Sequence, residues 1–462
     1  MKTNTIIAGI DIGNTKITTV ISETGPDGTA DIIGEASVPT DGLKRGAIIN
    51  LERTAEAIES SLAAAERVAG VHADTAYIGV SGQHVKAITS HGLAAIRRQQ
   101  AISAADIDRA VENGRAVSHD PHYEAIHVLP QEYVVDGQDG VKNPIGLNGV
   151  RLEVDVHLIT AHSGTLNNVR RCVQDAGVRE GGVALKILAA GIATLEPHER
   201  GQTVLLIDMG GGTTDVGLFR RGNLAYTTSV PYGSDSVTTD LAHILKVGYD
   251  DAELLKRKLG AACPTLADDD LSATITTIEG AQYTVHAHEL ARVIHARITE
   301  ILNMIHADLS AHFGAAFLAD SVILTGGGSL LRGASDVTRT TFHLPVRIGR
   351  PRGIGGLTDI VASPAHATAV GLALYGLAGD GDTQALLARP EPDVRVPAPQ
   401  RPPTTPAPAP KKRDKPRPEP RPDIRAVQLD FDAPQVPDAP ARTRPQGPSL
   451  KDKLTRMFRE WL

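Results

Sequence analysis

The stretch Leu205-Leu206-Ile207-Asp208-Met209-Gly210-Gly211-Gly212-Thr213-Thr214-Asp215 decides the fold of this chain. An apolar run leads into its three glycines and residues 216–219 lead out, which predicts two strands joined by a glycine turn. Glycines let the backbone approach a ligand and point several N–H groups the same way, so the turn can hold phosphate oxygens. Asp208, at the end of a buried strand, can hold Mg²⁺ directly or through water. A tight turn without a ligand is the alternative interpretation.

A second unit of the same kind lies near the start of the chain, where Asp11-Ile12-Gly13 aligns with Asp208-Met209-Gly210. Apolar strands flank its turn, Gly13-Asn14-Thr15-Lys16. Duplicated units predict two similar half-domains that face each other and hold the phosphate chain of a nucleotide between their turns. Asn14, Thr15 and Lys16 would supply donors, and Lys16 would add a positive charge. An ordinary hairpin is again the alternative.

A third glycine loop, Thr325-Gly326-Gly327-Gly328-Ser329, follows the apolar strand at 321–324 and is predicted to open a helix near Leu330. Glycines between a strand and a helix let the backbone press against a flat ligand, such as a purine and its ribose. A simple tight turn between strand and helix is the other interpretation.

Composition narrows the class of protein. The 462 residues suffice for two or three domains, and the net charge of −7 without a long basic tract in the ordered part argues against nucleic acid as a partner. The chain has only two cysteines, Cys172 and Cys263, so it cannot contain a disulfide framework, and their spacing is not that of metal ligands. This low cysteine content fits a reducing cytoplasm. The first residues do not read as a signal peptide, and no run approaches the roughly 18 apolar residues of a membrane-spanning helix.

Between these motifs the pattern is that of an α/β protein with an inserted small α+β domain. Helices are predicted at 50–70, 103–117, 163–176, 185–195, 234–246, 250–258, 286–311 and 365–377. In the insertion, inward-facing side chains are predicted to alternate with outward-facing ones: Val154, Val156 and Leu158 inward, and Glu153, Asp155 and His157 outward.

The end of the chain changes in character. Residues 390–448 hold 18 of the 29 prolines, which predicts a disordered tether. The segment 449–462 predicts an amphipathic helix, with lysines and arginines on the opposite side from an apolar face of Leu450, Leu454, Met457, Phe458, Trp461 and Leu462. Basic residues around an aromatic-rich face suggest the surface of an anionic membrane, while docking on the globular part is the alternative.

Taken in order, the three glycine motifs resemble the first phosphate, second phosphate and adenosine motifs of the actin/Hsp70/sugar-kinase ATPases. Within that superfamily the chain resembles the FtsA family of actin-like bacterial cell-division proteins, from about residue 6 to 378 and in the terminal helix. The strings that carry this resemblance are Asn143-Pro-Ile-Gly-Leu147, Arg151-Leu-Glu-Val-Asp155, Val237-Thr-Thr-Asp240, Ala252-Glu-Leu-Leu-Lys256, Ile354-Gly-Gly-Leu-Thr358 and Ala369-Val-Gly-Leu372.

The resemblance implies a duplicated actin-like ATPase fold with two lobes around a nucleotide cleft. The implied parts are a first lobe at 1–84 and 158–200, an inserted α+β domain at 85–157, a second-lobe core at 201–231 and 312–378, a second-lobe insertion at 232–311, a linker at 379–448 and a membrane-targeting helix at 449–462.

The resemblance also implies ATP with Mg²⁺ in the cleft, with Asp11 and Asp208 near the metal. Glu253 and Lys256, which on sequence alone would be a solvated surface pair, would meet the ribose and base. The implied nucleotide-binding residues are Asp11, Gly13, Asn14, Thr15, Lys16, Asp208, Gly210, Gly211, Gly212, Thr213, Thr214, Asp215, Glu253, Lys256, Gly326, Gly327 and Gly328.

The expected function is that of a filament protein that tethers the FtsZ ring to the cytoplasmic face of the cell membrane at the division site and recruits later division proteins. Expected partners are the FtsZ C-terminal tail, other division proteins, further copies of the chain and anionic lipids. A small-molecule kinase of the same superfamily is the alternative, and a chaperone would need a substrate domain in place of the linker. Residues 184–189, Ala-Leu-Lys-Ile-Leu-Ala, lack the water-orienting Glu or Gln of efficient relatives, so fast ATP turnover is not expected.

Overall fold

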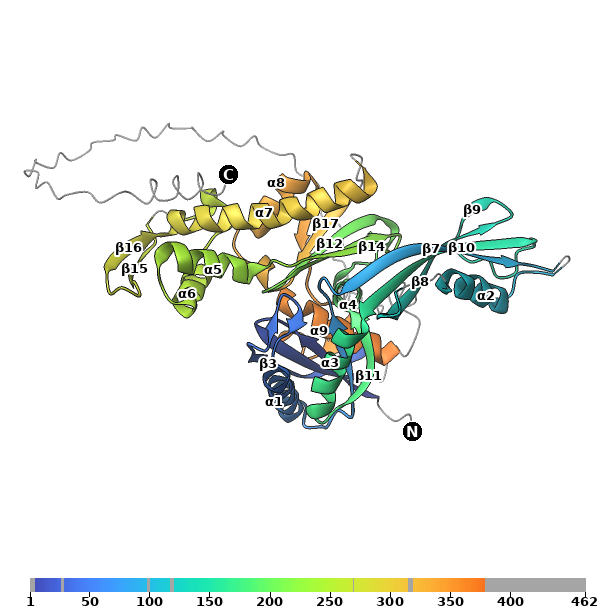
Figure 1. Cartoon of the computed structure of the whole chain (residues 1–462), viewed down its shortest axis with the longest axis horizontal. Coiled ribbons are helices and arrows are strands. Elements are labelled where there is room, and N and C mark those ends of the chain that lie inside the picture. Colours follow the sequence, from blue (N-terminus) through green and yellow to red (C-terminus); the bar gives the residue numbers. More distant parts are fainter. Residues whose placement is uncertain are drawn as a thin grey trace, which may run out of the picture. The chain divides into compact units, whose positions relative to one another are not determined.

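The computed structural model of the chain (Figure 1) describes residues 5–25, 29–97, 100–116, 120–268, 270–314 and 319–378. The predicted linker at 379–448 and the predicted amphipathic helix at 449–462, with its six apolar residues, lie outside the described residues. Within the described ranges, the helices are too short or too polar to cross a membrane.

The first sheet is built from the N-terminal hairpin and has the strand order β11–β6–β1–β2–β3–β19. The hairpin strands β1 and β2 pair antiparallel, whereas β1 pairs parallel with β6. Nearly continuous runs of Ile, Val and Ala allow these central strands to be buried on both faces. The strands are β1 (Ile6–Ile12), β2 (Lys16–Thr24), β3 (Ala30–Pro39), β6 (Thr75–Val80), β11 (Arg179–Leu185) and β19 (Ile354–Gly356), and the short pair β4 (Leu43–Lys44) and β5 (Ala47–Ile48) follows β3.

The second sheet repeats this arrangement, with the order β14–β13–β12–β17–β18. Here β12 pairs antiparallel with β13 and parallel with β17, as β1 does with β2 and β6. The internal repeat predicted from the two Asp–Gly units is therefore present in the strand order and in the pairing. The strands are β12 (Thr203–Met209), β13 (Thr214–Arg220), β14 (Asn223–Val230), β17 (Ser321–Thr325) and β18 (Val346–Ile348).

Helices α4 (Lys186–Thr194) and α9 (Ala367–Ala378) lie at the junction of the two sheets (Figure 1). They approach so closely that a Cβ at Gly371 would overlap the Ala189 carbonyl oxygen. Their side chains share one buried core with strands of both sheets. The close approach is possible because both helices are rich in Ala and Gly, whose small side chains leave room between the two backbones.

Helices α1 (Leu51–Ala69) and α3 (Ser163–Asp175) contribute to a separate apolar core of the first sheet. The Asn50 side chain accepts a hydrogen bond from the Arg53 N–H at the start of α1, and Gly70 ends the helix in a left-handed conformation. Both ends of α1 thus follow the prediction, because Asn and Gly are favoured at these two positions.

The predicted inserted region contains its own sheet, β7–β10–β8–β9, with a helix on one face. Its elements are β7 (Val85–Ala95), α2 (Ala104–Arg115), β8 (Tyr123–Val135), β9 (Gln138–Val141) and β10 (Arg151–His162). The predicted outward face of β10 was wrong in part, because Glu153 and His157 are buried. Glu153 is covered by the side chains of Arg151 and His91, which contact its carboxylate at 2.6 and 2.9 Å. Asp155, also predicted outward, is exposed.

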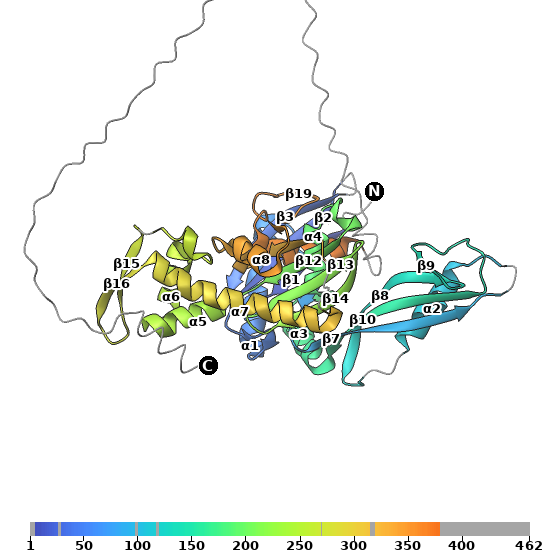
Figure 2. The same cartoon turned by 90° about the horizontal axis from the view of Figure 1, so that it is seen from above.

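A helical region follows β14 and carries a small hairpin. Figure 2 shows α5 and α6 beside the part of α7 that is nearest the β15–β16 hairpin. The predicted helices are confirmed to within a few residues. The elements of this region are α5 (Ser234–Leu245), α6 (Tyr249–Leu259), η2 (Pro264–Leu266), β15 (Ser272–Thr276), β16 (Gln282–His286) and α7 (Ala287–Phe313). Elsewhere in the described residues lie the 3-10 helices η1 (Glu199–Gly201), η3 (Gly327–Leu330) and η4 (Pro364–His366) and the helix α8 (Ala334–Phe342).

Candidate functional site

A cavity of about 590 Å³ collects most of the residues predicted to bind a nucleotide. Both Asp–Gly turns, the third glycine loop and helix α6 contribute to its wall. The predicted residues that line it are Asp11, Gly13, Asn14, Thr15, Lys16, Asp208, Gly210, Gly211, Gly212, Thr213, Asp215, Glu253, Lys256, Gly326, Gly327 and Gly328. Thr214 is not among them, because its buried hydroxyl donates a hydrogen bond to the Tyr232 carbonyl at 2.8 Å.

The two Asp–Gly hairpins form the same turn. The Gly13 N–H donates to the Lys16 carbonyl at 3.1 Å, and the Gly210 N–H donates to the Thr213 carbonyl at 3.0 Å. The turns also approach each other, since a Cβ at Gly212 would overlap the side-chain amide of Asn14. The absence of a side chain at Gly212 therefore leaves room for Asn14 and allows the two turns to approach closely.

Three carboxylates and one ammonium group meet in the wall of this cavity. Lys186 Nζ lies 2.8 Å from Asp11 Oδ1 and donates a hydrogen bond to the Ile12 carbonyl at 2.6 Å. Burial, with the nearby charges of Asp215 and Asp11, raises the pKa of Asp208 to about 7. Burial also raises the pKa of Asp215. A cation or a hydrogen-bond donor that entered this region would stabilise the ionised carboxylates.

Two hydroxyl groups hold the carboxylates of the second hairpin. Thr368, on α9, donates to Asp208 Oδ2 at 2.8 Å, and Ser229, on β14, donates to Asp215 Oδ1 at 2.6 Å. Sequence reasoning missed both residues. Thr368 also lines the cavity, but it lies 160 residues from Asp208 in a helix of small residues, so no local pattern marks it.

The predicted pair on α6 is held tightly and is not a free surface couple. Lys256 Nζ lies 2.6 Å from Glu253 Oε2 and donates to the Thr238 hydroxyl at 2.8 Å and to the Ser234 carbonyl at 3.1 Å. A second cation, Arg257, contacts the other Glu253 oxygen at 2.6 Å. These contacts fix both side chains at the cavity wall, where Lys256 is buried.

The third glycine loop follows β17, and its conformation depends on Gly326. Gly326 has a φ of +81°, and a Cβ there would overlap Asp208 Oδ1. In contrast, a Cβ at Gly327 would meet no atom within 4 Å. A helix does lie near Leu330 as predicted, but it is the short 3-10 helix η3, and the α-helix α8 begins only at Ala334. Gly333, with a φ of +83°, separates the two elements because this conformation cannot continue a right-handed helix.

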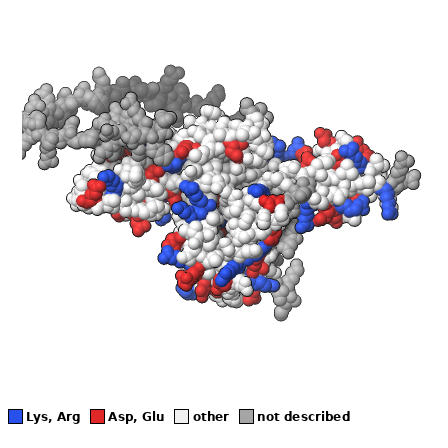
Figure 3. Space-filling model, viewed as in Figure 1, with Lys and Arg blue, Asp and Glu red and all other residues white. Residues whose placement is uncertain are grey.

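The cavity combines glycine backbone with several cationic side chains. Arg257, Lys258 and Arg332 line it in addition to Lys16 and Lys256. Burial lowers the pKa of Lys16, against the opposing effect of nearby carboxylates. Figure 3 shows acidic and basic side chains interspersed over one face of the molecule, without one dominant sign. The chemistry of the cavity suits an anionic ligand with several phosphate oxygens.

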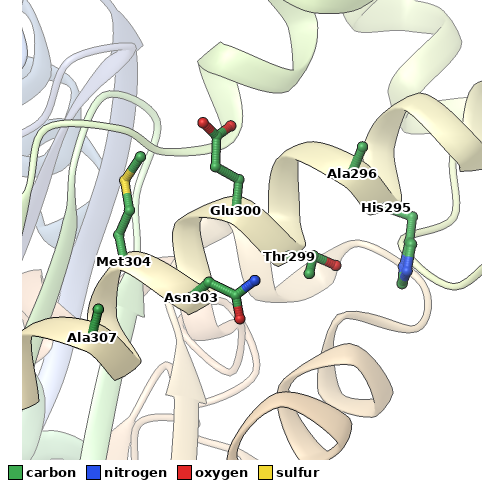
Figure 4. A pocket seen from close by; sticks show the side chains of 7 residues that line it. All are labelled: His295, Ala296, Thr299, Glu300, Asn303, Met304 and Ala307. Atoms are coloured by element: carbon green, nitrogen blue, oxygen red, sulfur yellow. The ribbon is translucent and has the colours of Figure 1, made fainter. Parts of the chain in front are cut away.

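A second hollow, of about 540 Å³, lies along α7 (Figure 4). None of the predicted site residues contributes to it. Its lining comes from one helix and consists of His295, Ala296, Thr299, Glu300, Asn303, Met304 and Ala307. A hollow lined by one helix does not bring together polar groups from several elements, as the cavity of about 590 Å³ does. We therefore place the candidate site at the cavity of about 590 Å³.

Comparison with known proteins gives two matches to family models. Residues 205–371 match the model described as cell division protein FtsA, and residues 82–160 match the model described as the SHS2 domain inserted in FtsA. The cell division protein FtsA of Pseudomonas aeruginosa is 33% identical over 378 residues, which cover 82% of this chain and 90% of that protein. The FtsA of Borreliella burgdorferi is 35% identical over 373 residues, which cover 80% and 90%.

Among solved structures, the chain is similar to the PilM-PilN type IV pilus biogenesis complex. The TM-score is 0.59 at 17% sequence identity, and the match covers 80% of this chain and 98% of that one. At this level of identity the likeness concerns the fold alone. The two sheets of repeated strand order and the inserted domain form the predicted α/β actin-like fold.

Proposed function

Because the chain belongs to the FtsA family of cell-division proteins, we propose that it binds ATP and acts as an actin-like membrane tether of the FtsZ ring. The observation that carries this proposal is the cavity lined by both Asp–Gly turns and by the third glycine loop. Each motif alone has a simpler interpretation as a turn. All three motifs line one cavity, which is also lined by several lysine and arginine side chains, and this combination favours a nucleotide as the ligand.

The turns at 13–16 and 210–213 would hold the phosphates, because their glycines leave backbone N–H groups accessible to oxygen atoms. Lys16 would add a positive charge beside the phosphate chain. The loop at 326–328 would lie against the purine and ribose, with Glu253 and Lys256 toward the same end. Open space at Gly327 supports this placement, since a flat ligand can lie directly on the backbone there.

The acidic groups fit Mg²⁺ only in part. Among the described residues, no three His, Cys, Asp or Glu side chains are arranged to hold a metal ion. Asp208 and Asp11 would instead bind the ion directly or through a bridging water. This arrangement suits Mg²⁺, which retains several waters and is bound by one or two carboxylates together with phosphates. When bound, the ion would neutralise phosphate charge. Asp11 is already paired with Lys186.

We expect slow ATP turnover. The first residue of α4 is Lys186, whose ammonium group can donate hydrogen bonds but cannot accept a proton from an attacking water while it is charged. No carboxylate or amide occurs in residues 184–189. A protein that retains ATP can use it as a structural ligand that sets the filament state.

The remaining parts of the proposal concern partners, and they follow from family membership and from the C-terminal sequence. We propose that the predicted lobe boundaries hold, that the region 232–311 binds the FtsZ tail, and that the region 85–157 faces other division proteins or the next subunit. The terminal helix would bind anionic lipid on the cytoplasmic face of the cell membrane at the division site. Family membership favours this function over a small-molecule kinase.

Flotation of the full-length protein with anionic vesicles and a labelled FtsZ C-terminal peptide tests the tether. With ATP, the wild type should carry the peptide to the vesicle fraction. Trp461→Glu should reduce flotation of both protein and peptide by at least about tenfold, because it places a charge on the apolar face of a marginally bound helix.

Trp461→Phe is the matched control, since it retains an aromatic group and should float like the wild type. Many tails arrayed on one filament give strong avidity, so the comparison should be made at equal protein concentration. If the Trp461→Glu protein still floats with the peptide as the wild type does, the tail is not the anchor.

A further inference from the structure

Lys186 is a largely buried cation among the acidic residues of the cavity. Its side chain is 13% exposed, and it lies at the start of α4 rather than on either phosphate turn. Its stem passes over Gly79, where a Cβ would come within 2.8 Å of Lys186 Cγ. The absence of a side chain at Gly79 thus makes room for the lysine, whose position is set by packing along its length.

The ammonium group has fixed partners on one side. It pairs with Asp11 Oδ1 at 2.8 Å and donates to the Ile12 carbonyl at 2.6 Å. An ammonium group carries three N–H donors, so at least one remains for a ligand in the cavity that Lys186 lines. The ion pair with Asp11 and the hydrogen bond to the Ile12 carbonyl hold this charged group at the cavity wall.

The Lys186 ammonium group contacts Asp11, the carboxylate that would otherwise be available to bind the metal ion. Mg²⁺ at a nucleotide gains from carboxylates that act on it directly or through water. Asp11 is partly neutralised by Lys186 before any ion arrives, while the same ammonium group offers a donor and a positive charge to phosphate oxygens. A bound ion would therefore compete with Lys186 for Asp11, and both would act on the same phosphate oxygens.

We propose that Lys186 supplies to the nucleotide phosphates part of the positive charge that Mg²⁺ supplies elsewhere, so that ATP binding by this protein depends only weakly on Mg²⁺. This inference rests on the proposed binding of ATP in the cavity. It concerns affinity, and it assigns a binding role to a residue outside the three glycine motifs.

Equilibrium binding of a fluorescent ATP analogue, with Mg²⁺ or with EDTA, tests the inference. Removal of Mg²⁺ should weaken binding to the wild type by less than about tenfold. In Lys186→Gln it should weaken binding by a further factor of about ten or more, the scale of one charge-assisted hydrogen bond. Lys186→Arg retains the charge and should stay closer to the wild type. Lys142→Gln, an exposed lysine outside the cavity, is the matched control and should equal the wild type.

The outcomes separate this inference from the proposed function. Loss of more than about a hundredfold in wild-type affinity on removal of Mg²⁺ would overturn the role of Lys186 and leave ATP binding intact, and this result needs no variant to fold. Equal Mg²⁺ dependence in the wild type and Lys186→Gln would do the same. Failure of the wild type to bind the analogue with or without Mg²⁺ would overturn both.

Discussion

The two Asp–Gly hairpins have one backbone design and two different electrostatic settings. Both turns close with the same hydrogen bond, and both strand pairs have the same register. In the first hairpin Asp11 lies opposite Thr18, whereas in the second Asp208 lies opposite Asp215. A repeated backbone therefore places carboxylates at equivalent positions, and the neighbouring residues decide what each carboxylate can do.

The partners of the two aspartates come from different helices. Asp11 meets the ammonium group of Lys186 on α4, and Asp208 accepts a hydrogen bond from the hydroxyl of Thr368 on α9. One carboxylate is neutralised by a cation, and the other is left with a pKa near 7 beside a second acid. An incoming cation should therefore interact more favourably with the second hairpin, because Asp208 has a hydroxyl partner where Asp11 already has an ion pair.

The largest expected effect concerns two matched substitutions in the ligand-free protein at pH 8, which should change the free energy of unfolding in opposite directions. Asp11→Asn should lower the free energy of unfolding by about 3 kcal/mol, because it leaves the largely buried Lys186 ammonium group without its closest carboxylate. Asp208→Asn should raise the free energy of unfolding, by up to about 4 kcal/mol, since a carboxyl with its pKa raised to about 7 is costly to ionise in the folded state.

The sign for Asp208 follows from linkage. Between about pH 4 and pH 7 the unfolded chain has lost the Asp208 proton and the folded protein retains it, so wild-type stability falls as pH rises through this window. Urea unfolding at pH 5 and pH 8 measures both variants. The gain from Asp208→Asn should be smaller at pH 5, and a loss of stability in both variants at pH 8 would contradict the contrast.

A smaller effect is expected from alanine in the two turns. A Cβ at Gly13 would lie 2.5 Å from the Lys16 carbonyl oxygen, whereas a Cβ at Gly210 would lie 3.1 Å from the Thr213 carbonyl oxygen. Gly13→Ala should therefore cost about 1–3 kcal/mol of stability by overpacking. Gly210→Ala should cost less than about 1 kcal/mol, because the reduced freedom of the unfolded chain offsets a mild contact. Thermal unfolding measures both losses of stability. If Gly210→Ala cost as much as Gly13→Ala or more, the expected difference in crowding between the two turns would be contradicted.

Local sequence patterns were sufficient to predict the hairpins, the glycine loops and most helices. Asp and Gly at a strand end mark a turn wherever it occurs, and Asn50 and Gly70 mark the ends of a helix through short-range hydrogen bonds. The resemblance of motifs then placed Glu253 and Lys256 near the glycines, and both do line the same cavity.

Contacts between distant segments could not be predicted in this way. Nothing local to Lys186 indicates that it reaches Asp11, and nothing local to Thr368 indicates that it reaches Asp208, because both contacts arise from the packing of α4 and α9 between the sheets. The exposure of Glu153 was mispredicted for a related reason. The alternation of a strand predicts the direction in which a side chain points, but it does not predict that Arg151 and His91 will cover the Glu153 carboxylate.

Titration calorimetry of Mg·ATP into the wild type, Gly327→Trp and Gly201→Trp tests most directly whether the cavity between the two hairpins is the nucleotide site. Neither glycine has an atom within 4 Å of a Cβ added there, but Gly327 lines the cavity and Gly201 lies outside it. We predict one ATP per chain for the wild type and Gly201→Trp, and at least about tenfold weaker binding for a folded Gly327→Trp, whose indole would fill the base end of the site. Unchanged ATP affinity in Gly327→Trp would contradict the account.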